Sequence, residues 1–173
     1  YTDLYTPIRK LFAEYGEVPS ESETGGSVPS RKKLPRIDAG AFSFNRPGGR
    51  CEVCEGMGTV RNHLVFFADS EVPCPACQGR RFQDHVLAVR FQGLSISDML
   101  DLSVDEALSV FEASTPESSA PECAFTRSLL RILRLLKDVG LDYLTLGQSL
   151  TTLAEAECQR LKLARELLKA PTG

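Results

Sequence analysis

The sequence predicts an α+β fold, mainly α, in which a small cysteine-bearing β module is inserted into a helical domain. Two observations carry this prediction. Four of the six cysteines form two Cys-x-x-Cys pairs inside residues 42–92, where neighbouring stretches alternate like short strands. On both sides of that segment, apolar residues recur with the three- and four-residue spacing of amphipathic helices. The expected order is therefore helix, inserted module, helices.

A helix is predicted over residues 6–15. Thr6 suits its N-cap and Pro7 its first helical position, and the apolar side chains that follow repeat at helical spacing. The next stretch, residues 17–41, is rich in Ser, Glu, Gly and Pro and cannot bury much apolar surface. We expect residues 1–16 to form one helix of the helical domain, and residues 17–41 to be a mobile loop.

The cysteine-bearing module is predicted to span residues 42–92. Residues 59–67 have the composition of a strand, and residues 85–91 alternate over the length of another. The side chains expected on one face of this other strand are His85, Leu87, Val89 and Phe91. A small β module is the expected result.

Residues 93–173 are predicted to be helical. Ser103 and Glu106 have the three-residue spacing of a capping box, which opens a short helix through Phe111. A polar loop is expected over residues 112–124.

Two longer helices complete the predicted helical domain. Residues 126–139 are apolar at helical spacing, and Gly140 stops their helix because glycine accepts the left-handed backbone of a helix C-terminus. Thr152 is expected to start the last helix, and Pro171 to end it.

Composition argues against several classes of protein. The chain has 173 residues, of which 42% are hydrophobic and 25% charged, as in an ordinary soluble globular protein. No run approaches the roughly 18 consecutive apolar residues of a membrane span. A net charge of −3 argues against a simple polyanion-binding protein, although residues 31–50 could form a local basic face. The chain opens without an initiator Met or an export signal, so we expect a piece of a longer protein in a reducing cytoplasm.

Four cysteines have the spacing of a metal site: Cys51, Cys54, Cys74 and Cys77. Two-residue gaps let adjacent thiolates converge on one tetrahedral ion, and the two pairs then close a hairpin over residues 55–73. A glycine follows each pair at the same position, Gly56 and Gly79, as the turn under a metal requires. Four thiolates leave no position for water, so the expected Zn²⁺ is structural and the hairpin is unfolded without it.

Other interpretations of these residues stay open. Two disulfides or four free thiols are the alternatives to a metal. His63 and His85 could be ligands, although the site is complete without them, and Cys123 and Cys158 have no partner at metal-site spacing. A thiol oxidoreductase would need one exposed Cys-x-x-Cys pair at a helix N-terminus, whereas these four cysteines are a matched set.

A series of motifs follows in order along most of the chain. In the module these are Phe42-Ser-Phe-Asn45, Gly48-Gly-Arg-Cys-Glu-Val-Cys54, Glu55-Gly-Met-Gly58 and Val72-Pro-Cys-Pro-Ala-Cys77. In the helical part they are Asp101-Leu-Ser-Val-Asp-Glu-Ala-Leu108, Asp138-Val-Gly-Leu-Asp-Tyr143, Leu146-Gly-Gln-Ser149, Thr151-Thr-Leu153, Glu157, Gln159-Arg160 and Lys162-Leu-Ala164. The ordered set resembles the UvrA family, the damage-recognising ATPase subunits of the bacterial excision nuclease. The resemblance covers nearly all of residues 42–169.

The resemblance implies the ABC signature subdomain of the second nucleotide-binding domain of such a protein, with an inserted four-cysteine zinc hairpin. It implies DNA binding in nucleotide excision repair, in the bacterial cytoplasm. The implied partners are double-stranded DNA, preferentially damaged, the remaining nucleotide-binding domains, a dimer partner and a UvrB-type protein. ATP and Mg²⁺ belong to the parent protein only, because this chain contains neither a P-loop pattern nor a Walker B segment and is not expected to be an enzyme alone.

The signature loop departs from the family. Where the family has Leu-Ser-Gly-Gly-Glu, this chain replaces the Ser and both Gly with Ala154, Glu155 and Ala156. In an ABC-type ATPase that loop offers a hydroxyl and bare amides at a helix N-terminus to the γ-phosphate. We expect Thr152 and Glu155 to form a capping box instead, with the Glu155 carboxylate repelling phosphate. The competing interpretation is that the changes only extend a helix, by divergence or by design. The family residues retained here are Glu157, Gln159 and Arg160.

The candidate DNA contacts are basic residues around the cysteine pairs. Arginine beside a rigid knuckle is well placed to reach phosphates without reading sequence, which suits a sensor of DNA deformability. Solvated surface charge is the competing interpretation for each. Pro47 stands where the family usually has Lys, so one phosphate contact is expected to have shifted to Arg46 or been lost. The candidates are Arg46, Arg50, Arg61, Arg80 and Arg81, with Lys32 and Lys33 on the preceding loop.

Two rival binding roles remain. DnaJ-type chaperone modules also use Cys-x-x-Cys-x-Gly-x-Gly, but they carry four such repeats, whereas this chain has two and only the first keeps both glycines. A UvrA paralogue in transport or drug resistance would keep the same motifs with a divergent signature.

Overall fold

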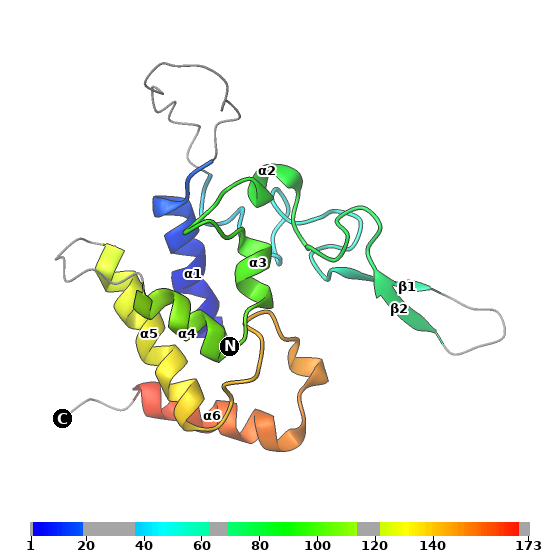
Figure 1. Ribbon diagram of the computed structural model, residues 1–173. Coiled ribbons are helices and arrows are strands. Elements are labelled where there is room, and N and C mark those ends of the chain that lie inside the picture. Colours follow the sequence, from blue (N-terminus) through cyan, green and yellow to red (C-terminus); the bar gives the residue numbers. More distant parts are fainter. Residues whose placement is uncertain (1, 19–36, 63–68, 114–121, 170–173) are drawn as a thin grey trace, which may run out of the picture. The chain divides into compact units, whose positions relative to one another are not determined.

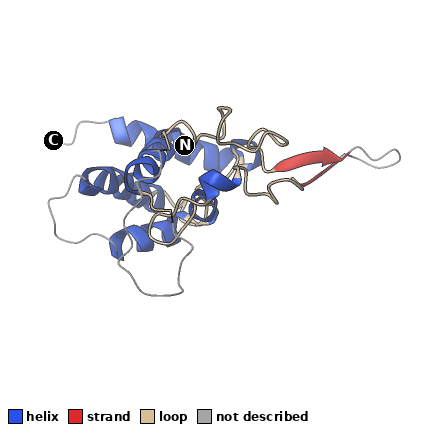
Figure 2. Cartoon of the chain, turned by 90° about the horizontal axis from the view of Figure 1, so that it is seen from above, coloured by secondary structure: helices blue, strands red, loops and turns tan. Residues whose placement is uncertain are grey.

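The computed structural model describes residues 2–18, 37–62, 69–113 and 122–169 (Figure 1). Its elements, in chain order, are α1 (Thr2–Tyr15), β1 (Thr59–Asn62), β2 (Ser70–Pro73), α2 (Asp84–Leu87), α3 (Ile96–Asp101), α4 (Val104–Ala113), α5 (Glu122–Asp138), the 3₁₀ turn η1 (Leu150–Thr152) and α6 (Glu155–Lys169). The two described strands form one small sheet and the other elements are helical, which confirms the α+β, mainly α, fold class (Figure 2).

The chain divides into two compact units. We call Tyr1–Leu11 with Asp98–Gly173 the helical unit, and Phe12–Ser97 the cysteine unit. Across the described ranges, no helix has both the length and the apolar character needed to cross a membrane.

Helix α1 begins earlier than predicted, and the assignment of Thr6 as its N-cap is wrong. Its apolar face already includes Leu4, which is buried like Ile8 and Leu11. Burial of this face outweighs the amide hydrogen bond that Pro7, now inside the helix, cannot make.

The predicted capping box opens α4. The Ser103 hydroxyl accepts a hydrogen bond from the Glu106 amide at 3.2 Å, and the Glu106 carboxylate accepts one from the Ser103 amide at 2.8 Å. Helix α4 packs against α5, and the largest fully buried side chains of this pair are Phe111, Leu129 and Leu133.

Helix α5 ends at Asp138, and Gly140 closes it as predicted. Gly140 has φ +75°, its amide donates to the Lys137 carbonyl, and the Leu141 amide donates to the Leu136 carbonyl, both at 2.9 Å. This double closure is the usual use of glycine after a helix. The predicted polar loop over 112–124 is wrong at its edges, where the chain is helical, and residues 114–121 lie outside the described residues.

The cysteine unit has an aromatic core. The ring centroid of Phe12 lies 5.6 Å from that of Phe42 and 5.9 Å from that of Phe91, and all three side chains are buried. The antiparallel strands β1 and β2 pair from Thr59 with Pro73 to Asn62 with Ser70. The rest of the predicted strand 59–67 lies outside the described residues, as does most of the predicted loop 17–41.

The strand predicted over residues 85–91 is wrong. Its first part belongs to α2, where the amides of Val86 and Leu87 both donate to the Gln83 carbonyl, at 3.0 and 3.1 Å. An extended segment follows, in which the Arg90 amide donates to the Glu17 carbonyl at 2.7 Å. Residues 85–91 therefore combine a short helical turn with an extended segment, and their alternating apolar residues only resembled those of one strand.

Candidate metal centre

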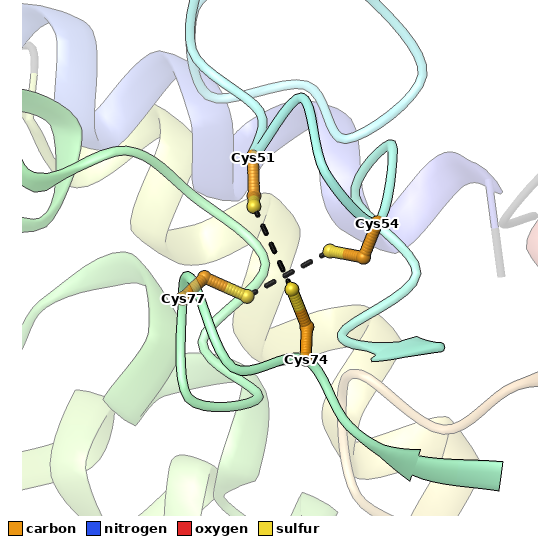
Figure 3. A group of neighbouring side chains, drawn as sticks. All are labelled: Cys51, Cys54, Cys74 and Cys77. Atoms are coloured by element: carbon orange, nitrogen blue, oxygen red, sulfur yellow. Dashed lines mark hydrogen bonds between the residues drawn. The ribbon is translucent and has the colours of Figure 1, made fainter. Parts of the chain in front are cut away.

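The structure brings the four predicted cysteines to one point (Figure 3). Sγ of Cys51 lies 3.9 Å from Sγ of Cys74, and Sγ of Cys54 lies 3.7 Å from Sγ of Cys77. All four sulfur atoms lie within 4.8 Å of one another, and all four residues are buried. A tetrahedron with metal–sulfur bonds of about 2.3 Å has edges of roughly 3.8 Å, so these separations fit one tetrahedral ion. They are far longer than the roughly 2.05 Å of a disulfide bond, and the four thiols are free.

Two turns with matching left-handed positions form the centre. We call residues 51–58 the first knuckle and residues 74–81 the second knuckle. In both, the two residues after the second cysteine and the last residue of the knuckle have left-handed backbone. The φ angles are 51°, 82° and 80° for Glu55, Gly56 and Gly58, and 53°, 81° and 71° for Gln78, Gly79 and Arg81.

Gly56 is required for a second reason. A Cβ atom at this position would lie 2.4 Å from the carbonyl oxygen of Phe44, which no relaxed structure permits. The Phe42-Ser-Phe-Asn45 segment therefore packs directly under the first knuckle.

The knuckles close on each other by a reciprocal pair of backbone hydrogen bonds. The Cys51 amide donates to the Arg81 carbonyl at 2.8 Å, and the Cys74 amide donates to the Gly58 carbonyl at 2.9 Å. Each first cysteine is thus held by the last residue of the opposite knuckle.

Amide groups also point at two of the sulfur atoms. The Gly58 amide donates to Sγ of Cys54 at 3.3 Å, and the Arg81 amide donates to Sγ of Cys77 at 3.4 Å. Donors of this kind stabilise the negative charge of a thiolate.

Proton loss from the thiols differs within the centre. The backbone amide of Cys77 lowers the pKa of the Cys74 thiol to about 7, whereas burial raises the pKa of the Cys77 thiol to about 12. At neutral pH a cation entering the centre must therefore displace protons. Four soft sulfur donors at tetrahedral spacing suit Zn²⁺ and leave no position for a catalytic water. Both pairs lie in turns rather than at a helix N-terminus, so the geometry does not favour a thiol oxidoreductase.

His85 lies on the exposed face of α2 and does not join the cluster, and His63 lies outside the described residues. Cys158 lies on α6, half-buried, and is not among the four clustered cysteines. Lys32 and Lys33 also lie outside the described residues.

The five candidate DNA-contact arginines differ in their surroundings. Arg46 and Arg61 are exposed, and Arg61 lies on β1 directly opposite Glu71. The Arg80 side chain is 46% exposed and lies 3.8 Å from the Asp84 carboxylate. Its Nε donates to the Cys77 carbonyl at 3.2 Å, which fixes its direction.

Arg50 and Arg81 are half-buried. The Arg50 side chain is only 19% exposed and its Nε lies 4.0 Å from the Glu52 carboxylate. That Nε is buried and makes no hydrogen bond among the residues described. The Arg50 side chain is therefore less accessible to a phosphate than that of Arg80.

The start of α6 differs from the prediction. Leu150–Thr152 form η1 and the helix begins at Glu155, so Ala154 is the residue that precedes it. The Ala154 amide donates to the Glu157 carboxylate at 2.7 Å. The predicted capping box of Thr152 and Glu155 is therefore wrong, because Glu157 is the acid three residues after the N-cap. Glu155 and Ala156 are exposed in the first turn.

Tyr143, for which the sequence predicted no role, holds Glu157 in place. The Tyr143 hydroxyl donates a hydrogen bond to the Glu157 carboxylate. This bond is the main cause of the lowered pKa of Glu157 and of the raised pKa of Tyr143. Arg160 in turn donates to the Gly140 carbonyl at 3.3 Å, while Gln159 is exposed. No local pattern could have indicated Tyr143, because it is 14 residues from its partner.

Comparison with known proteins gives consistent matches. No family model matches the chain. UvrABC system protein A of Xylella fastidiosa (strain 9a5c) is 42% identical over all 173 residues, and that of Neisseria meningitidis serogroup A is 43% identical over the same length. The chain spans only 15% and 16% of these two relatives. The crystal structure of UvrA2 from Deinococcus radiodurans matches 98% of this chain, and 18% of its own, at 41% identity with a TM-score of 0.72.

Proposed function

Because the chain belongs to the UvrA family, we propose that it is the zinc-containing DNA-binding module of a longer UvrA-like ABC ATPase that recognises damaged DNA in nucleotide excision repair. The observation that carries the proposal is the buried cluster of four cysteine sulfurs within 4.8 Å of one another. The match over the whole chain to proteins named UvrABC system protein A supports the family context. The segment itself is proposed to bind rather than to catalyse.

Zn²⁺ is the proposed ligand of Cys51, Cys54, Cys74 and Cys77. When bound, it contributes folding energy on the order of 10 kcal/mol and no reaction chemistry. The chain's own residues then determine what the rigid module presents: two knuckles and the β1–β2 hairpin that joins them.

Double-stranded DNA, preferentially damaged, is the proposed partner of this module. Contacts to phosphate would position the duplex without reading its sequence, and a damaged duplex would differ in its deformability. The proposed contacts come from Arg46, Arg50, Arg61, Arg80 and Arg81, with Lys32 and Lys33.

The domain organisation is part of the proposal. Residues 1–16 and 93–173 would form the signature subdomain, residues 17–41 a loop, and residues 42–92 the zinc module. The parent protein would supply the remaining nucleotide-binding domains, ATP with Mg²⁺, a dimer partner and contacts to a UvrB-type protein. It would act in the bacterial cytoplasm.

The altered signature loop is proposed to bind no γ-phosphate. Ala154 has no hydroxyl, and Glu155 adds a carboxylate in the first turn of α6 where the family has glycine. A second anion there would meet repulsion rather than free amides. Restoring Ala154, Glu155 and Ala156 to Ser-Gly-Gly in the parent should raise ATP hydrolysis, and unchanged hydrolysis would count against this half-site proposal.

The central experiment measures DNA binding by the parent protein with and without a lesion in the duplex. The Cys74→Ser variant should lose metal and lose the preference for damaged DNA, whereas Cys158→Ser should keep both because Cys158 is not part of the cluster. Equal lesion preference in the intact protein and Cys74→Ser would refute the proposal.

A paralogous role in transport or drug resistance is the second candidate, favoured by the replaced signature residues Ala154, Glu155 and Ala156. A parent that binds DNA without any lesion preference would point to that role.

A further inference from the structure

The two knuckles match at their left-handed backbone positions but differ in side-chain chemistry. Their matched left-handed residues and reciprocal hydrogen bonds define which positions correspond. Counting from the cysteines, Glu55 corresponds to Gln78, Met57 to Arg80, and Gly58 to Arg81.

Charge separates the knuckles. The first knuckle carries the exposed acids Glu52 and Glu55 and the exposed apolar side chains Val53 and Met57, which are 61% and 68% exposed. The second knuckle carries no acid and ends in Arg80 and Arg81. Since Zn²⁺ with four thiolates has a net charge of about −2, a phosphate can approach only where basic groups offset that charge.

The backbone of Arg81 adds independent support. Arg81 has φ 71° where its counterpart Gly58 has φ 80°, a conformation that glycine adopts freely and arginine only with strain. Glycine would adopt this backbone conformation without strain, so an arginine kept at position 81 indicates that its side chain has a function. The side chain lies against the first knuckle, because a Cβ on Gly58 would be 3.0 Å from its Cγ and 3.3 Å from its Nε.

Arg80 is also held in place. Its Nε donates to the Cys77 carbonyl at 3.2 Å, one Nη lies 3.8 Å from the exposed Asp84 carboxylate, and the side chain remains 46% exposed. A guanidinium fixed through one nitrogen still has further donors for a phosphate, and little side-chain entropy remains to be lost on binding.

We propose that, of the two knuckles, only the second makes phosphate contacts, through Arg80 and Arg81, and that the first makes none. This inference rests on the proposed DNA-binding function. It states which of the two similar turns contacts the phosphates of the DNA.

The test uses the parent protein and an undamaged duplex, with affinity measured from roughly 50 to 200 mM salt. Arg80→Met and Arg81→Gly each introduce the residue that the first knuckle has at the corresponding position, so the backbone of the second knuckle can accommodate both substitutions. The double variant should bind roughly tenfold more weakly, with a log–log salt slope shallower by about two, because each phosphate contact contributes roughly 0.9. Zinc content should stay at one ion per chain.

The matched control is Glu55→Gln, which places the second knuckle's Gln78 on the first. Because no phosphate is expected near Glu55, affinity and slope should not change. Tighter binding by Glu55→Gln would place phosphate at the first knuckle and overturn the inference. An unchanged slope in the double variant would also overturn it.

The inference and the proposed function fail in different ways. A parent that binds DNA in a zinc-dependent manner, with a slope insensitive to Arg80→Met and Arg81→Gly, retains the function and loses the inference. A parent that binds no DNA with both knuckles intact loses both. If the double variant lost zinc, Arg80→Met alone would decide, since it leaves the backbone bonds of the knuckle untouched, and it should reduce the slope by about one.

Discussion

Tyr143 donates a hydrogen bond from its hydroxyl to the carboxylate of Glu157 and so joins the turn after α5 to the first turn of α6. The other oxygen of the same carboxylate accepts the Ala154 amide at 2.7 Å. One side chain therefore caps α6 and ties its start to the turn after α5. This double contact gives a structural reason for a glutamate at position 157.

Loss of this anchor should change how stability depends on pH. The Tyr143 hydroxyl and the Ala154 amide lower the pKa of Glu157. The resulting stabilisation is present above the ordinary glutamate pKa of about 4.3, and is lost as pH falls through the lowered folded value. Tyr143→Phe removes the larger cause, so we expect a smaller loss of stability between about pH 5 and pH 3 than in the unmodified chain.

Thermal unfolding across that pH range measures the effect. Glu157→Gln, which has no carboxyl group to titrate, is the reference and should show the smallest loss of all three chains. If all three chains lost the same amount of thermal stability as the pH fell, the contact would not contribute to stability.

A serine at the N-cap should stabilise α6. Ala154 has no side-chain oxygen for the amides of the first turn, although Glu157 already supplies the other half of a capping box. Ala154→Ser should complete the box and raise the free energy of unfolding by about 0.5–1 kcal/mol. The same exchange at Ala156, inside the first turn, should lower it by up to about 0.5 kcal/mol. Urea unfolding compares the two, and an equal effect at both positions would exclude capping as the cause.

Local chemistry accounts for what the sequence predicted correctly. The Ser103 and Glu106 box, the glycine stop at Gly140 and the spacing of the cysteine pairs each depend on residues a few positions apart. The errors arose where packing overrode a local signal. Pro7 suggested a helix start, but the buried Leu4 extends α1 beyond it.

Features that join distant residues were not predictable from the sequence. The Cys51 amide meets the Arg81 carbonyl, and Tyr143 meets Glu157, only after the chain has folded. Spacing alone predicted that the four cysteines come together, but it did not reveal that the two knuckles match in their left-handed positions, because one ends in Gly58 and the other in Arg81.

The capping box of α4 offers a direct measure of its own contribution. Ser103→Ala removes the hydroxyl that accepts the Glu106 amide at 3.2 Å and donates to its carboxylate at 2.9 Å. We expect a loss of about 1 kcal/mol in the free energy of unfolding. Ser109→Ala is the control, because the Ser109 hydroxyl only bonds back to the Asp105 carbonyl at 3.0 Å within the same helix. A loss at Ser109 as large as that at Ser103 would contradict the capping account.

Metal removal should unfold the knuckles and leave the helical unit folded. The β1–β2 sheet is small. Among the described residues, its hydrophobic cluster consists of the four buried cysteines with the partly buried Val60 packed against them, so it has little apolar core of its own. Hydrogen exchange after treatment with a chelator should show rapid exchange at the amides of Cys51, Cys74 and Arg81, and slow exchange throughout α5.

Rebinding of Zn²⁺ at neutral pH should release protons, because cysteine thiols in unfolded knuckles have the ordinary pKa of about 8.5 and are mostly protonated. Affinity should therefore fall as pH falls, since protons compete with the ion for the same sulfur atoms. Calorimetry in buffers of different ionisation enthalpy counts the protons released, and a count of zero would mean that the thiols are not the ligands.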